Sequence, residues 1–190
     1  MARGVAKDHD AKRGALRKGA ATYFADHGFD RASMMGAARA CGVSKALIYH
    51  YWDSKEALLF DILDTHLSEL VEAVDAAKAG GLEALIRAIL LAYADADAEH
   101  KLQLEVLGVL PAKRQEPLIK MQRHLVVVMS EALAQERPAL DEDRLRAVAM
   151  SVFGILNWYY MWHRPGRGMS HARQAHENAW YIHSSPCAPQ

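Results

Sequence analysis

The chain has 190 residues, 51% of them hydrophobic and 24% charged, which is typical of a globular protein with one good core or two small ones. Its formal net charge is zero, which excludes a uniformly basic or acidic protein. Residues 1–52 nevertheless carry nine Lys and Arg against four Asp, a net charge of +5 balanced by −5 on the other 138 residues, and this split favours binding of a polyanion near the N-terminus.

The first predicted helix carries Leu16, Ala20, Tyr23 and Phe24 at positions i, i+4, i+7 and i+8, and Gly28 ends it. The second, over residues 34–40, is a compact run of small and apolar residues. It stops at Cys41-Gly42-Val43, where glycine can adopt the positive φ that a sharp turn after a helix requires.

The third predicted helix, residues 45–51, starts directly after this turn. Ser44 is a good N-cap for it, and Asp53 followed by Glu56 resembles a capping box for the next helix. Three helix starts within such a short stretch are typical of a helix-turn-helix, so we predict a three-helix DNA-binding domain.

The outer face of the third helix suits the major groove of DNA. A period of 3.6 turns Ile48 inward toward Val43 and leaves four residues outside, namely Lys45, Ala46, Tyr49 and His50. Lysine donates to guanine acceptors and alanine contacts the thymine methyl group. We interpret Tyr49, Tyr51 and Lys55 as phosphate contacts, which set register rather than read sequence.

The segments YFADHGFDRAS and AARACGVSKALIYHYWDSKEALL resemble the DNA-binding domain of the TetR/AcrR family of bacterial repressors. This resemblance covers about the first third of the chain. It implies base-reading positions at Lys45, Ala46, Leu47 and Tyr49, and a phosphate contact from Lys55 at the start of the fourth helix. The full set of expected DNA-binding residues is Ser33, Met35, Ser44, Lys45, Ala46, Leu47, Tyr49, His50, Tyr51 and Lys55.

Two residues depart from the family pattern. Trp52 stands where the family usually has Phe, a change that packing tolerates. Gly36 lies in the middle of the second predicted helix, where it costs roughly 1 kcal/mol relative to alanine.

The rest of the chain is predicted to be helical, with a long fourth helix over 55–78 closed by Gly80-Gly81. Further helices are expected over 82–96, 99–110 (stopped by Pro111), 117–136 (Pro117 at its first position), 142–163 (capped by Asp141) and 171–182. The fold class is therefore all-α with about nine helices. We divide it into a helix-turn-helix domain, 1–54, and a ligand-binding and dimerisation domain, 55–190.

The helix over 142–163 is apolar nearly all round, so it requires partners on more than one side. The family resemblance implies that the last two helices form the interface of a homodimer. The final helix is short and polar for this role, so either the preceding helix carries most of the contact or the dimer is unusual. We expect a homodimer because one helix-turn-helix domain contacts only one half-site of a palindromic operator.

The resemblance also implies a ligand cavity among helices four to eight. Its candidate lining residues are mostly apolar or aromatic, which favours a small hydrophobic or aromatic effector oriented by His124 and Asn157. The alternative is that such stripes at helical spacing are ordinary core. The candidates are His66, Leu70, Tyr93, Leu107, Met121, His124, Leu125, Met129, Phe153, Asn157 and Trp158.

Motifs for catalysis or metal binding are incomplete. His176-Glu177 begins like the zinc-protease pattern, but Trp180 replaces the second histidine. The acidic run from Asp95 to His100 is interpreted as a solvated helix start rather than a metal site. We therefore expect no catalytic residue, no metal and no cofactor.

The cysteines, Cys41 and Cys187, are too few and too distant for a disulfide framework. The basic N-terminus lacks the apolar segment of a secretory signal, and the most apolar stretch, 147–162, is shorter than the roughly 20 residues that span a bilayer. We expect a cytoplasmic protein that does not associate with membranes.

The favoured function is a ligand-responsive transcriptional repressor that binds a palindromic operator as a dimer and is released by its effector. The alternative is a helical enzyme or small-molecule carrier without specific DNA binding. Lys45 and Tyr49 are expected to face outward on a short capped helix, where the fold does not require these residue types. Their presence favours the transcriptional regulator over the enzyme or carrier.

Overall fold

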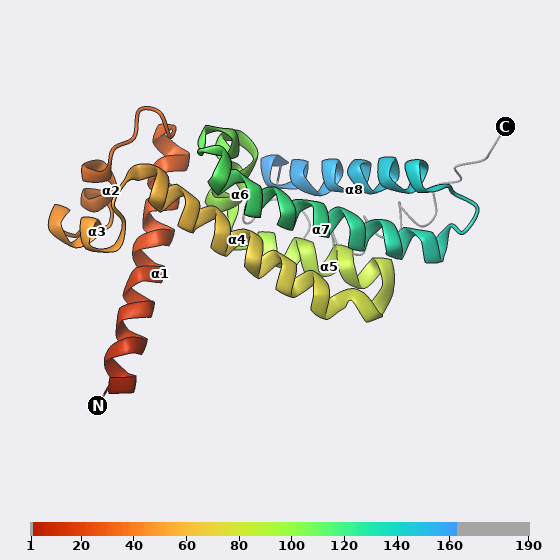
Figure 1. Cartoon of the computed structure of the whole chain (residues 1–190), viewed down its shortest axis with the longest axis horizontal. Coiled ribbons are helices and arrows are strands. Elements are labelled where there is room, and N and C mark those ends of the chain that lie inside the picture. The colour runs from red at the N-terminus through yellow and green to blue at the C-terminus, as the bar shows by residue number, and fades with distance from the viewer. Residues whose placement is uncertain (1, 163–190) are drawn as a thin grey trace. The chain divides into compact units, whose positions relative to one another are not determined.

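The computed structural model describes the backbone of residues 2–162 and the side chains of residues 9–158. Over this range the regular structure is entirely helical, which confirms the all-α class (Figure 1). The helix expected over 171–182 lies outside the described residues. The α-helices are α1 (Ala2–His27), α2 (Met34–Ala40), α3 (Lys45–Tyr51), α4 (Lys55–Ala77), α5 (Gly81–Tyr93), α6 (Asp97–Val106), α7 (Ala112–Glu136) and α8 (Glu142–Trp162), with 3₁₀ helices η1 (Lys78–Gly80) and η2 (Leu107–Val109).

These helices form two compact units. The first contains the chain up to Leu67 together with Ala96–Leu118, and the second contains Ser68–Asp95 and the chain from Ile119 onward. Helices α4 and α7 each contribute residues to both units. This division reflects packing, whereas the boundary expected between residues 54 and 55 is one of function and remains a prediction.

In the first unit, α1 packs against both α2 and α6, and α2 packs against α3. Gly28, with a φ of 78°, follows the last residue of α1, as the sequence predicted. On α6, the Lys101 Nζ donates to the Ala25 carbonyl at 2.9 Å, and so satisfies a group that the end of α1 leaves without a helical partner. The core of this unit includes Leu16, Ala20, Phe24, Phe29, Ile48, Trp52, Leu58 and Leu59.

In the second unit, the core is mainly aliphatic. Helix α5 buries one side at the spacing of an amphipathic helix, and it packs against α8. Helix α7 is joined to the end of α4 by polar contacts, among them His124 Nε2 to Asp75 Oδ1 at 2.8 Å. The buried residues of α5, α7 and α8 include Leu82, Leu85, Ile86, Ile89, Leu90, Leu125, Val128, Met129, Leu133, Ala149, Val152 and Leu156.

The start of α4 corrects one sequence prediction. Ser54, not Asp53, is its N-cap, because the Ser54 Oγ accepts a hydrogen bond from the Ala57 N–H at 3.0 Å. A cap side chain binds the N–H two or three residues ahead, and Ser54 stands at that spacing from Ala57. Glu56 then lies in the first turn of α4 rather than at the end of a capping box.

The start of α7 also differs from the sequence prediction, which placed Pro117 at the first position of this helix. The helix begins at Ala112, and the Pro111 carbonyl accepts from the N–H groups of Arg114 and Gln115 at 2.8 and 3.1 Å. Pro117 lies inside the helix rather than at its first position. Because proline has no N–H, the carbonyl four residues earlier loses its usual helical donor, so α7 lacks one hydrogen bond near its start.

The other bounds differ by a few residues. Helix α5 ends at Tyr93 rather than 96, and α6 followed by η2 replaces a single helix over 99–110. Asp141 caps α8 as predicted, since its Oδ1 accepts from the Arg144 N–H at 2.8 Å. Over the described residues, the combination of length and hydrophobicity that a membrane-spanning helix needs is not found.

Candidate nucleic-acid interface

Helices α2 and α3 are joined by the turn that the sequence predicted. Gly42 has a φ of 68°, and the Val43 N–H donates to the Ala38 carbonyl at 2.9 Å, which closes the end of α2. The Ser44 Oγ accepts from the Leu47 N–H at 3.2 Å, which caps α3. The two helices are therefore ended and restarted by local hydrogen bonds within a few residues.

Gly36 is required by the approach of α1 to α2. A Cβ atom at this position would collide with the hydroxyl and ring of Tyr23, which occupies the space beside the glycine. The expected propensity cost of glycine in a helix is thus offset by close packing between the two helices. What looked like a departure from the family pattern is a local fit between residues 23 and 36.

The exposed face of α3 matches the prediction. Ile48 is fully buried, whereas Lys45, Ala46, Tyr49 and His50 are exposed and Leu47 is half-buried. The Lys45 Nζ lies 5.5 Å from the centre of the Tyr49 ring, so the two side chains stay together on the surface. The face offers a cation, a methyl group and two aromatic rings to whatever approaches it.

The expected contacts on α2 lie at its N-terminal end. Ser33 is exposed, but its hydroxyl accepts from the Gly36 N–H at 3.1 Å and serves as the N-cap. Met35 is 45% exposed, and its Sδ is 3.2 Å from the Arg39 Nη2. Arg39 is exposed as well and adds a cation that our expected set omitted. Its spacing of four residues from Met35 was the available signal.

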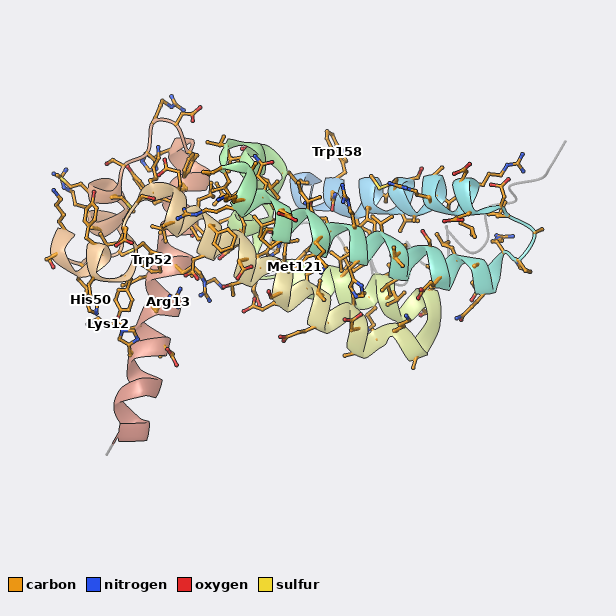
Figure 2. All side chains as sticks on the ribbon, in the orientation of Figure 1. Lys12, Arg13, His50, Trp52, Met121 and Trp158 are labelled. Atoms are coloured by element: carbon orange, nitrogen blue, oxygen red, sulfur yellow. The ribbon has the colours of Figure 1, made fainter. Side chains whose placement is uncertain are left out.

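Tyr51 is only half-buried and belongs to an aromatic cluster. Its ring centre lies 4.8 Å from that of His9 and 5.3 Å from that of His50. The cluster joins the N-terminal half of α1 to the end of α3, and Figure 2 labels His50 beside Lys12 of α1. Sequence spacing did not predict this contact because the residues are about forty positions apart.

Lys55 has partners that the sequence did not predict. Its Nζ donates to the carbonyls of Phe29 and Ala32 at 2.8 and 3.1 Å, with the Asp30 carbonyl at 3.5 Å. The ammonium group also lies 4.3 Å from the centre of the Phe29 ring. Lys55 thus holds the loop between α1 and α2 against α4. A phosphate contact would require the ammonium group to give up or share one of these carbonyls.

Three polar side chains, those of His66, His100 and Gln103, are buried in the first unit. His66 of α4 and His100 of α6 have ring centres 5.8 Å apart, and Gln103 of α6 is buried in the same unit. Burial lowers the pKa of His66 to about 4, and burial with the neighbouring His66 lowers the pKa of His100 to about 3. His66 was expected to line a cavity and His100 to belong to a solvated helix start, whereas both rings are buried.

The candidate effector residues are divided between the units. His66 and Leu107 lie in the first unit, and the other nine lie in the second. His66, Leu70, Tyr93, Leu125, Met129 and Phe153 are buried; Leu107, Met121, His124 and Asn157 are intermediate; and Trp158 is 58% exposed.

The two polar groups expected to orient an effector have protein partners. The Tyr93 hydroxyl donates to the Asn157 Oδ1 at 3.1 Å, and burial raises the pKa of Tyr93. His124 binds Asp75 on a surface where its side chain is 43% exposed. Among the described residues, no three His, Cys, Asp or Glu side chains gather in a way that would hold a metal ion.

Comparison with known proteins gives matches over both parts of the chain. The model of bacterial regulatory proteins of the tetR family matches residues 16–62. The model of the tetracyclin repressor-like C-terminal domain matches residues 77–182, which is more than half of the chain. The first match covers α2, the turn and α3, the elements with the exposed face described above.

Solved structures agree with this result. A TetR-family transcriptional regulator from Bordetella parapertussis is 31% identical with a TM-score of 0.86, over 92% of this chain and 95% of that one. AibR in complex with isovaleryl coenzyme A and operator DNA is 22% identical with a TM-score of 0.72, over 88% of this chain and 96% of that one. At this lower identity, the likeness to AibR shows the fold alone.

A curated relative matches over a shorter segment. The HTH-type transcriptional activator FasR of Mycolicibacterium smegmatis is 36% identical over 72 residues, which are 38% of this chain and 33% of FasR. The match therefore spans about a third of that relative's length. The TetR regulators are a non-enzymatic family, and this sets aside the helical enzyme considered above. The chain belongs to the TetR family and is a DNA-binding transcriptional regulator.

Proposed function

We propose that the protein is a repressor that binds a palindromic operator as a homodimer and leaves it when a small hydrophobic or aromatic effector binds. The observation that carries this proposal is the exposed face of α3, on which Lys45, Ala46 and Tyr49 point outward while Ile48 anchors the helix. We assign base reading to Lys45, Ala46, Leu47 and Tyr49. Of the remaining candidates, the polar residues Ser33, Ser44, His50, Tyr51 and Lys55 position the helix on the phosphates, and Met35 contacts DNA through its apolar side chain.

The surface of α8 supports a homodimer. Met150 and Trp158 are 55% and 58% exposed, and Ile155 is 53% exposed. Ala147, Ser151 and Gly154 are exposed as well, and they share a helical stripe with Met150 and Trp158. Small residues between large apolar ones allow a second helix to approach closely, so we propose that α8 pairs with its copy in a cytoplasmic dimer.

The apolar interior of the second unit supports a hydrophobic effector. Leu70, Leu125, Met129 and Phe153 are buried in this unit, which also contains the hydrogen-bonded pair of Tyr93 and Asn157. AibR, which shares the fold, was solved with an acyl thioester and operator DNA together. A differential affinity of a few kcal/mol between the bound and free conformations is enough to empty an operator.

The direction of control needs its own test, because the curated relative FasR is named an activator. Purified protein is incubated with sheared genomic DNA at physiological salt, and the retained fragments are sequenced and footprinted. We expect enrichment of one palindrome. In vitro transcription from that fragment should fall when the protein is added, and a rise would replace repression by activation.

Lys45→Ala is the control variant for this selection. We expect it to cost about 1 to 3 kcal/mol at the selected site and to leave binding to random duplex nearly unchanged. Equal losses on both DNAs would contradict a base-reading role. Isovaleryl coenzyme A and benzoate serve as aliphatic and aromatic probes of release, and release by neither would contradict the proposed effector class.

A further inference from the structure

Trp52 and Asp61 form a contact for which a phenylalanine at residue 52 would have no donor. Trp52 follows the last residue of α3, and its backbone N–H donates to the Ile48 carbonyl at 3.1 Å, which closes the final turn of that helix. Its indole Nε1–H donates to the Asp61 Oδ2 at 3.1 Å. The ring itself is only 4% exposed. The indole hydrogen bond therefore fixes the end of α3 to α4 from inside the first unit.

Asp61 also binds α1. Its Oδ1 accepts from the Arg13 Nη2 at 2.7 Å, and the Arg17 Nη1 lies 3.6 Å from its Oδ2. The Asp61 side chain is 15% exposed, so solvent screens these charged contacts less than it screens surface pairs. The Arg13 guanidinium carbon lies 6.0 Å from the centre of the Trp52 ring. Figure 2 shows Arg13 of α1 and Trp52 labelled where α1, α3 and α4 meet.

We propose that Asp61 is a positioning residue. Through its hydrogen bond from the Trp52 indole N–H it sets the angle of α3, and so it determines the specificity of the protein for its DNA sequence. A carboxylate held by Arg13 and Arg17 cannot turn freely, and the direction of its second oxygen fixes where the indole must lie. Because Trp52 ends α3, a change in its position moves the exposed face that carries Lys45 and Tyr49. Readout of base edges by hydrogen bonds tolerates such movement less than contact with phosphates does.

Trp52→Phe is the sharpest variant, because it removes the N–H donor and keeps an aromatic ring in the core. We expect its affinity for the selected operator to fall about tenfold, the loss typical of one hydrogen bond to a charged group, with little change on random duplex. Asp61→Ala should lose at least as much. In the double variant the two losses should not add, because either change removes the same bond.

Asp64→Asn is the matched control on the same helix. Burial and the nearby Asp61 raise the pKa of Asp64, but the carboxylate of Asp64 takes no part in the contacts of Trp52 and Arg13. The control should keep the ratio of operator to random affinity. A ratio that is unchanged in Trp52→Phe and Asp61→Ala, with only a lower melting temperature, would overturn the proposal in favour of a merely structural role.

Hydrogen exchange tests the positioning without DNA. Amides of residues 45–52 should exchange about tenfold faster in Trp52→Phe than in the native protein, while those of α5 stay unchanged. Unchanged exchange in α3 would overturn the inference. The DNA measurement uses the operator of the proposed function; if the native protein selects no operator, that function fails, and the exchange result still decides whether Asp61 holds α3.

Discussion

The two compact units use polar side chains in different ways. In the first, Lys55 and Lys101 bind backbone carbonyls, Asp61 joins three helices, and the rings of His66 and His100 are buried. In the second, the described core is aliphatic and aromatic, and its polar contacts include Tyr93 with Asn157.

This difference matters for what each unit can do. Hydrogen bonds to charged groups depend on direction and distance, so they hold the helices of the first unit at defined angles. Apolar contact has no preferred direction, and a core of that kind tolerates a change of partners. A surface that reads base edges requires the first property, and a site that accepts a hydrophobic effector benefits from the second.

The largest effect should come from acid, through the histidines of the first unit. Their folded pKa values are about 4 and about 3, below the usual 6.5, so the unfolded chain binds protons that the folded chain does not as pH falls below 6.5. We expect the free energy of unfolding to fall by roughly 2 kcal/mol per histidine between pH 7 and pH 5. Urea unfolding at both pH values measures this loss.

His100→Phe is the control for the acid effect, because it keeps an aromatic ring and removes one titrating group. Between pH 7 and pH 5, the two histidines together lower the free energy of unfolding of the native protein, and this variant should show about half of that decrease. The same pH dependence in variant and native protein would show that these buried rings do not cause it.

Gly36→Ala tests the contact between α1 and α2. Helix propensity alone predicts a gain of about 1 kcal/mol, whereas collision with Tyr23 predicts a loss of about 3 kcal/mol, so we expect a net destabilisation of about 2 kcal/mol. Thermal unfolding decides the sign. Adding Tyr23→Phe, which removes the nearest atom, should recover part of the loss. A stabilised Gly36→Ala protein would mean that Tyr23 moves aside without cost.

Lys55→Met removes a cation from loop carbonyls and should lower the free energy of unfolding by about 2 kcal/mol. Lys101→Met is the matched variant in the same unit, and its effect should be smaller because, among the described residues, Lys101 donates to one carbonyl, that of Ala25. Lys55→Met should also weaken binding to operator and random DNA alike. A loss confined to the operator would assign Lys55 to base reading.

Tyr93→Phe should have the smallest effect, about 1 kcal/mol, because water can reach the half-buried Asn157 that loses its donor. Chemical unfolding of the variant measures it. If Tyr93→Phe lowered the free energy of unfolding as much as Lys55→Met does, directional hydrogen bonds would stabilise the second unit as well. The two units would then not differ in how they use polar side chains.

Sequence reasoning succeeded where the signal was local. The bounds of α2 and α3, the turn at Gly42 and the burial of Ile48 depend on residues within about one helical turn of one another. Such patterns are written directly in the order of residues. The cap of α4 was misplaced by one residue because Asp53 and Ser54 both suit that role and only the backbone decides between them.

Contacts between distant residues could not be predicted in the same way. Arg13 and Asp61 are 48 positions apart, and Lys55 and Phe29 are 26 apart. Whether such side chains meet depends on how two helices cross, which spacing along the chain does not specify. Lys55 could therefore be recognised as a cation in a family motif, while its carbonyl partners became known only from the fold.

The contact between α1 and α6 bears on how the DNA-binding segment can be used in isolation. Residues 1–54 contain α1 but not α6, which packs against α1 and supplies Lys101 to its last turn. A fusion that transplants only those residues would leave apolar surface of α1 open to water and its end without that cap. Residues 1–54 are therefore not suited to transfer into another regulator by themselves. Hybrid proteins should instead exchange residues 1–67 together with 96–118.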